Sequence, residues 1–135
     1  MNTVLSGTGP VSLSASGRGA LNAAPFTPSA YDHDLTMNDT AQSIPIARGV
    51  KKLRVVNDGV EGQGIRIAFG ATAAEAEDAL TMSGGAATTG LWISGAASTA
   101  HHPPEIIGVP ANAKFYAVAN DTASNTQSVY ISQGV

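Results

Sequence analysis

Short runs in which apolar and polar residues alternate recur between turn signals from Tyr31 onward, and this pattern constrains the fold more than any other feature of the chain. In GIRIAFG, for example, Ile65, Ile67 and Phe69 fall on one side of an extended chain, opposite Arg66. The stretches between the runs supply Gly, Asn and Asp, which tolerate the backbone angles of tight turns. Many short strands with regular turns predict an all-β protein.

About eight strands are expected, and each has one apolar side to bury. We therefore expect an antiparallel β-sandwich of the jelly-roll-like kind over residues 31–135. The expected strands occupy residues 33–37, 41–47, 51–57, 64–69, 90–94, 104–109, 113–120 and 128–133.

One segment, ATAAEAEDAL at 71–80, consists of good helix formers instead. Thr72 is placed to cap a helix and Glu75 follows three residues later, which is the spacing of a capping box. Ala76 and Leu80 give the segment only a weak apolar stripe. We expect one short helix that crosses between strands.

Two segments far apart in the chain loosely echo each other. PIARGVK at 45–51 and GVPANAK at 108–114 each read as the end of a strand, a turn and the start of a new strand. No repeat of fixed period accompanies them.

The chain has 135 residues, which is enough for one domain with a modest core. Charged residues make up 13% of it, about half the usual share of roughly 25%. Ala, Ser, Thr, Gly and Asn take their place. A surface of this kind suits a protein whose faces are partly covered by neighbours.

Charge and hydropathy limit the kinds of partner. The formal net charge of −3 argues against binding nucleic acid by neutralising phosphates. Lys51, Lys52 and Arg54 form a local basic cluster, which we interpret as a solvated or partner-facing strand surface. No apolar run approaches the roughly 18 residues that cross a bilayer, so no membrane partner is expected. The chain has no cysteine, which excludes disulfides.

Residues 1–30 are rich in Gly, Ser, Ala and Pro and show no lasting period, so we expect an extended N-terminal arm. Within it, VSLSAS alternates Val11 and Leu13 against serines, which is the pattern of a strand with one apolar side. An isolated strand is unstable, so this one would pair with a sheet edge in the same subunit or in another.

Residues that could perform chemistry are poorly placed. His101 and His102 are adjacent and point to opposite sides of an extended chain, while Asp32 and Asp34 lie on the face opposite His33. A metal site that combines these aspartates with a loop histidine stays open as a minor alternative. No serine lies in a Gly-x-Ser-x-Gly elbow, and no glycine-rich stretch ends in the Lys-Ser/Thr of a phosphate loop. We expect no enzyme, no catalytic or metal-binding residues and no cofactor.

The few aromatic residues divide between core and surface. Phe69 and Phe115 are expected in the core. If Leu91 and Ile93 are buried, Trp92 between them points outward, where it could anchor a partner. The candidate partner-binding residues are Val11, Leu13, Phe26 and Trp92.

The segments AQSIPIARGVKKLRVVNDG, GIRIAFG, IIGVPANAKFYAVAND and SVYISQGV together resemble a pattern found in small structural proteins of tailed bacteriophages. There, a strand ending in Ile-Pro leads through a turn to an Arg-Val-Val-Asn strand and then to an Ile-Ala-Phe-Gly strand. The resemblance covers roughly residues 35–135. It consists of strand ends and turns, so it carries over no site residues.

The resemblance implies a virion protein that assembles in the host cytoplasm. The expected role is a capsid decoration or cement protein, which stabilises the head by bridging subunits of the major capsid protein, with the arm docked on neighbours. The expected partners are the major capsid protein or other virion subunits, and copies of the chain itself in a homo-oligomer such as a trimer. A component of the neck, tail tube or tail tip, and a host-attachment or carbohydrate-binding module, are the alternatives.

Overall fold

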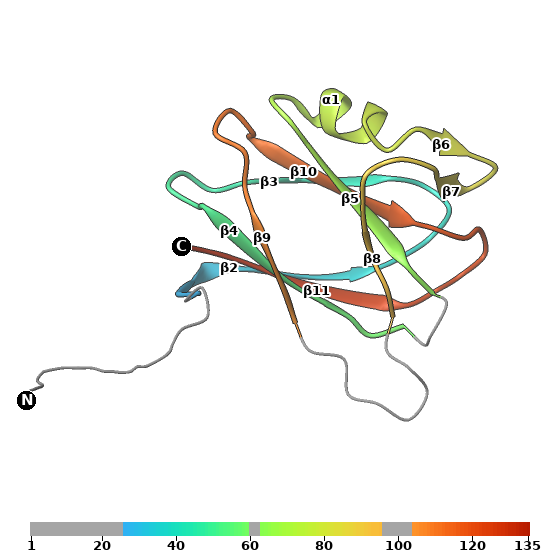
Figure 1. The fold of residues 1–135 in the computed structure, drawn as a ribbon, viewed down its shortest axis with the longest axis horizontal. Coiled ribbons are helices and arrows are strands. Elements are labelled where there is room, and N and C mark those ends of the chain that lie inside the picture. The colour runs from blue at the N-terminus through green and yellow to red at the C-terminus, as the bar shows by residue number, and fades with distance from the viewer. Residues whose placement is uncertain (1–25, 60–62, 96–103) are drawn as a thin grey trace, which may run out of the picture.

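The computed structural model describes residues 26–59, 63–95 and 104–135. In these residues, eight strands form two four-stranded antiparallel sheets (Figure 1). The first sheet has the order β2 (Pro28–Thr36), β11 (Ser128–Gly134), β4 (Lys52–Asn57), β9 (Glu105–Gly108). The second has the order β3 (Gln42–Pro45), β10 (Phe115–Asn120), β5 (Ile65–Gly70), β8 (Leu91–Ile93).

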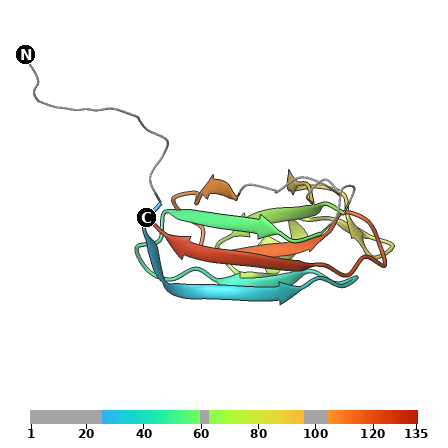
Figure 2. The ribbon, with the colours of Figure 1, turned by 90° about the horizontal axis from the view of Figure 1, so that it is seen from below.

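The two sheets pack face to face, as the expected sandwich requires. Figure 2 shows β4, β11 and β2 side by side in one layer, with strands of the second sheet behind them. Both sheets contribute alternate residues to one buried cluster, which consists of Leu35, Met37, Leu53, Val55, Ile65, Ile67, Ile93, Tyr116, Val118, Val129 and Ile131. The prediction of an all-β antiparallel fold is confirmed.

Strand β4 shows how the sequence pattern sets the core. Leu53 and Val55 are buried, and they alternate with the partly exposed Lys52, Arg54 and Val56. Lys52 and Arg54 therefore share the outer face of the first sheet, as the strand period predicts.

The outer face of the second sheet is covered by α1 (Ala73–Asp78) and by a hairpin of β6 (Met82–Ser83) and β7 (Ala86–Ala87). Small residues make this contact possible, because all the buried residues of the second cluster except Leu80 are alanines: Ala68, Ala76, Ala87, Ala117 and Ala119. The helix approaches so closely that a Cβ atom at Gly70 would lie 2.5 Å from the backbone nitrogen of Ala76.

The helix is confirmed, and its residues 73–78 lie within the expected range. The Thr72 hydroxyl accepts a hydrogen bond of 3.1 Å from the backbone N–H of Glu75, as a cap does. The Glu75 carboxylate reaches back to the backbone N–H of Ala71, at 3.2 Å, one residue before the position that a standard capping box would use.

Within the described residues, no helix is long and apolar enough to cross a membrane.

Several sequence expectations need correction. Strand β2 begins at Pro28, five residues before the expected strand and within the segment assigned to the arm. The hairpin of β6 and β7 was not expected, because its strands have only two residues each and flank two turn glycines, Gly84 and Gly85. Phe69 and Phe115 pack against the core but stay partly exposed, whereas Tyr116 is fully buried.

Candidate functional site

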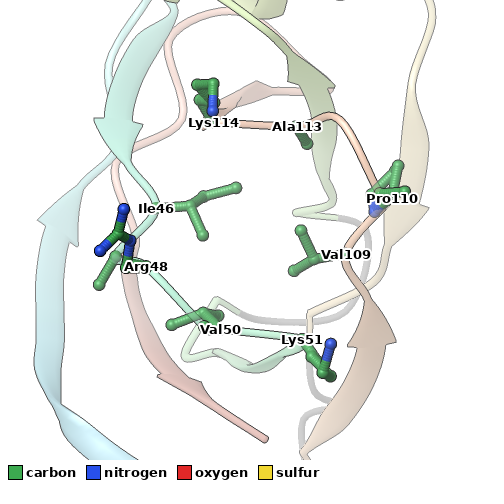
Figure 3. A pocket seen from close by; sticks show the side chains of 11 residues that line it. Ile46, Arg48, Val50, Lys51, Val109, Pro110, Ala113 and Lys114 are labelled. Atoms are coloured by element: carbon green, nitrogen blue, oxygen red, sulfur yellow. The ribbon is translucent and has the colours of Figure 1, made fainter.

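Two turns meet at one end of the sandwich and enclose a pocket of about 400 Å³. Residues 46–51 connect β3 to β4, and residues 109–114 connect β9 to β10, so each turn links one sheet to the other. These are the two segments that echo each other in the sequence. We call the hollow between them the end pocket (Figure 3).

The first of these turns has a defined geometry. The backbone N–H of Val50 donates to the carbonyl of Ala47 at 3.2 Å, and Gly49 between them has a φ of 85°. A positive φ at the third position is the mark of a type II turn, which favours glycine there. The turn places Arg48 at the exposed tip.

The rim of the end pocket is cationic and its floor is apolar. Figure 3 shows Lys51 and Lys114 on opposite sides of the opening, with Ile46 and Val109 pointing toward its middle. Lys51, Lys114 and Arg48 are exposed, and no acidic residue lines the pocket. Within the described residues, none of the three cations forms an ion pair. The floor residues pack against the main core, so the floor of the pocket is continuous with the interior of the sandwich.

Backbone hydrogen bonds hold both turns in place. Ile46 N–H donates to the carbonyl of Lys114 at 2.8 Å, and Lys114 N–H donates to the carbonyl of Gly70 at 2.9 Å. Val109 N–H donates to the carbonyl of Lys51 at 2.9 Å. The turns are thus joined to each other as well as to the sheets. These bonds hold the main chain of the residues that carry the cations in a fixed arrangement.

The chain enters the sandwich beside this pocket. Thr27 and Val135 exchange two backbone hydrogen bonds, of 2.8 and 3.1 Å, so the segment that precedes β2 pairs with the segment that follows β11. The exposed Tyr31 and Val135 border a small apolar groove of about 160 Å³, which shares Arg48 and residues 49–50 with the end pocket.

The candidate partner-binding residues have different outcomes. Val11 and Leu13 lie outside the described residues. Phe26 is half-buried, and its ring lies directly against Gly134, where a Cβ atom would overlap it. Much of this side chain therefore packs on the sandwich itself.

Trp92 is 49% exposed, in agreement with the outward orientation expected for it. Its indole N–H donates to the Asp121 carboxylate at 2.8 Å, and the other oxygen of that carboxylate pairs with Arg66 at 3.0 Å. The condition set for this orientation holds for Ile93 alone, because Ile93 is buried whereas Leu91 is also 49% exposed. Leu91 is in the edge strand β8, where the sandwich no longer covers it.

The residues weighed for chemistry stay dispersed. Asp32 and Asp34 are exposed on β2, and His33 between them has a buried Nδ1 with no hydrogen-bond partner in the described part of the chain. His101 and His102 lie outside the described residues. No group of three or more potential metal ligands occurs in the part of the chain that the structure describes. The minor metal-site alternative thus has no assembled ligand set among these residues.

The cationic end pocket was missed at the sequence level. The sequence shows Lys51 in a local cluster with Lys52 and Arg54. It gives no reason to expect Lys51 near Lys114, which lies more than sixty residues later. Only the fold brings them together. The echo between residues 45–51 and 108–114 was the one signal that could have paired the two turns.

Comparison with models of protein families and with curated proteins found no match for the chain.

Proposed function

We propose that this chain is a structural protein of a bacteriophage virion, and specifically a decoration or cement protein that binds the outer surface of the head shell. It would stabilise the shell by bridging subunits of the major capsid protein, after assembly in the host cytoplasm. The proposal assigns the chain no catalytic residue and no cofactor.

The order of the strands is the observation that carries the proposal. If the eight sandwich strands are numbered along the chain, the first sheet reads 1-8-3-6 and the second reads 2-7-4-5. We assign this order to a jelly roll, an architecture that recurs in viral capsid proteins and in lectins. The assignment of a jelly roll is part of the proposal. Because a fold alone does not define a function, the contact surfaces must support it.

Strand β2 supplies one such surface. It has nine residues and pairs only with β11 among the described strands, so its outer edge is open. The other edge strands are shorter, since β3 and β9 have four residues each and β8 has three. An extended segment from a neighbour could add a strand to β2.

The arm offers a segment of this kind. VSLSAS, at residues 11–16, has the alternation of a strand with one apolar side. An arm exchanged between copies, or laid on a shell subunit, adds buried area across a seam without any reaction. Stable interfaces bury on the order of 1,600 Å² in total, and binding to the assembled shell stabilises it by mass action.

Deletion of residues 2–25 tests the proposal. The deletion stops before Phe26 and Thr27, because these residues pack on Gly134 and pair with Val135. The truncated protein should keep its melting temperature but occupy purified phage particles much less than the full chain does. Equal occupancy by both proteins would refute the role of the arm.

Electron cryomicroscopy of particles that carry the chain would then locate it. Density over the head shell supports decoration, whereas density at the neck or tail places the protein elsewhere in the virion. Sedimentation of the free protein gives its oligomeric state, for which we propose self-association, with a trimer as the first form to test.

A further inference from the structure

We infer that the end pocket is the surface by which this protein recognises its partner, and that its occupant is an extended acidic segment of that partner protein. The inference rests on the proposed function, because it names the chemistry of the partner surface that the virion role requires.

Charge complementarity selects an anionic occupant. Three of the chain's seven basic residues, Arg48, Lys51 and Lys114, surround one opening in a protein whose net charge is −3. No acidic residue lines that opening, and these cations have no ion-pair partner among the described residues. Positive charges that cluster on a negatively charged protein attract a short anionic segment to that site. The protein as a whole repels a long polyanion such as DNA.

The apolar floor selects a peptide over a simple inorganic anion. Ile46, Val50 and Val109 line the pocket between the cations, and an ion such as phosphate gains nothing from such a surface. In an extended peptide, successive side chains point to opposite sides. Acidic side chains could thus reach Lys51 and Lys114, while their aliphatic stems or a neighbouring apolar residue covered the floor.

The pocket is organised before any partner binds. The turns are hydrogen-bonded to each other and to both sheets, and Gly49 holds the tip of one of them. The backbone N–H groups of Arg48 and Gly49 have no hydrogen bond to a described residue, so they remain available as donors. A preorganised site loses less conformational entropy on binding.

The position of the pocket ties it to the arm. The segment that enters β2 pairs with Val135 next to the groove that shares Arg48, Gly49 and Val50 with the end pocket. An arm that docks on a neighbour therefore holds this end of the sandwich close to the same neighbour. Two weak contacts linked in this way raise each other's effective concentration.

A peptide titration tests the inference directly. The probe is the capped peptide acetyl-Ala-Glu-Val-Glu-Ala-Glu-amide, added to the full chain at low salt while amide chemical shifts are recorded by NMR. We expect saturable shifts at Gly49, Lys51 and Lys114, and at least a tenfold loss of affinity between 50 and 500 mM NaCl because surface charges are screened. The same peptide with Gln in place of Glu should give no saturable shifts.

Two double variants provide the matched comparison. Lys51→Gln with Lys114→Gln removes two charges from the rim and should weaken peptide binding at least tenfold. Arg54→Gln with Arg66→Gln removes the same net charge from two strand residues that do not line the pocket, and should leave binding within twofold of the wild type. Equal weakening in both, or equal binding in both, would overturn the inference.

Other anions define the remaining outcomes. Inorganic phosphate and a short DNA duplex should each shift the three amides at least tenfold more weakly than the Glu peptide does at the same charge concentration. If either binds as tightly as the peptide, the pocket is a general anion site and the inference fails.

A particle assay separates this inference from the proposed function. If wild-type protein does not bind phage particles, the virion role fails, whereas the peptide titration still reports on the pocket. If the wild type binds particles and the Lys51/Lys114 double variant binds equally well, the virion role stands and the assignment of the pocket is wrong.

Discussion

The side-chain carbonyl of Gln133 accepts a hydrogen bond of 2.8 Å from the backbone N–H of Ala47, and this bond joins the last strand of the first sheet to the turn that leaves the second sheet. The amide nitrogen of the same side chain donates to the carbonyl of Pro45 at 3.0 Å. Gln133 is 1% exposed, so a buried amide fixes the turn that carries Arg48.

Replacement of Gln133 by Leu should lower the free energy of unfolding by about 1–3 kcal/mol, because it removes the partners of the Ala47 N–H and the Pro45 carbonyl in a part-buried site. Ser132→Ala, one residue away and partly exposed, should change stability by less than about 0.5 kcal/mol. Urea denaturation of both variants measures the difference. A Gln133→Leu protein as stable as the wild type would show that the turn finds other partners.

Gly49 and Gly108 separate backbone strain from crowding. A Cβ atom at either position would meet no atom within 4 Å, but only Gly49 has a positive φ, of 85°. Gly49→Ala should therefore cost about 1–2 kcal/mol, whereas Gly108→Ala should be neutral or stabilise by up to about 1 kcal/mol through the unfolded chain. Thermal unfolding of the two variants provides the comparison, and equal effects would contradict the type II turn.

Burial raises the pKa of the Tyr116 hydroxyl above its ordinary value near 10. The hydroxyl also has no hydrogen-bond partner among the residues that the structure describes. The folded state holds the proton more tightly than the unfolded state, so Tyr116 does not affect the pH dependence well below pH 10. Above pH 10 the unfolded state loses the proton first, and stability should fall by up to about 1.4 kcal/mol per pH unit.

Tyr116→Phe tests this prediction. The variant should lose the part of the alkaline destabilisation that Tyr116 causes, and it should be about as stable as the wild type or slightly more stable at pH 7, because it removes an unpaired buried hydroxyl. Tyr130→Phe is the control, since Tyr130 is 43% exposed. Identical pH profiles for the wild type and Tyr116→Phe would contradict the burial of this hydroxyl.

Trp92 is the single tryptophan of the chain, so its fluorescence reports on one site. Asp121→Ala removes the acceptor of the indole N–H and the ion-pair partner of Arg66. Because this network is near the surface, the free energy of unfolding should fall by only about 1 kcal/mol. Acrylamide should quench the fluorescence more strongly than in the wild type. Asp58→Ala, at an exposed aspartate outside this network, should leave quenching unchanged. Unchanged quenching in Asp121→Ala would show that Asp121 does not hold the indole.

Alternation and turn residues were sufficient to predict the eight sandwich strands, because strands such as β4 bury one face and the runs are bounded by residues suited to turns. Thr72 and Glu75 located the helix for a similar reason, since a cap is a local interaction. The hairpin of β6 and β7 could not be predicted, because two-residue strands show no period. Burial that depends on neighbours could not be decided either: Leu91 and Ile93 share one side of β8, but in this edge strand only Ile93 is buried.

The end pocket depends on contacts that sequence patterns do not encode. Lys51 and Lys114 come together only because the turn from β3 to β4 and the turn from β9 to β10 lie at the same end of the sandwich. The predicted site residues, in contrast, were chosen for local properties such as an aromatic ring or an alternating run. Trp92 is indeed exposed, but its position relative to the cations could be known only from the fold.

The ladder between Thr27 and Val135 has a practical consequence for anyone who wishes to display a cargo on this protein. A polypeptide fused after Val135 would emerge at the cationic end and would compete with the docking that we propose there. The turn at Gly84, where the backbone is exposed and a side chain would meet nothing, lies at the far side of the sandwich in Figure 1 and offers an insertion site that leaves that end free.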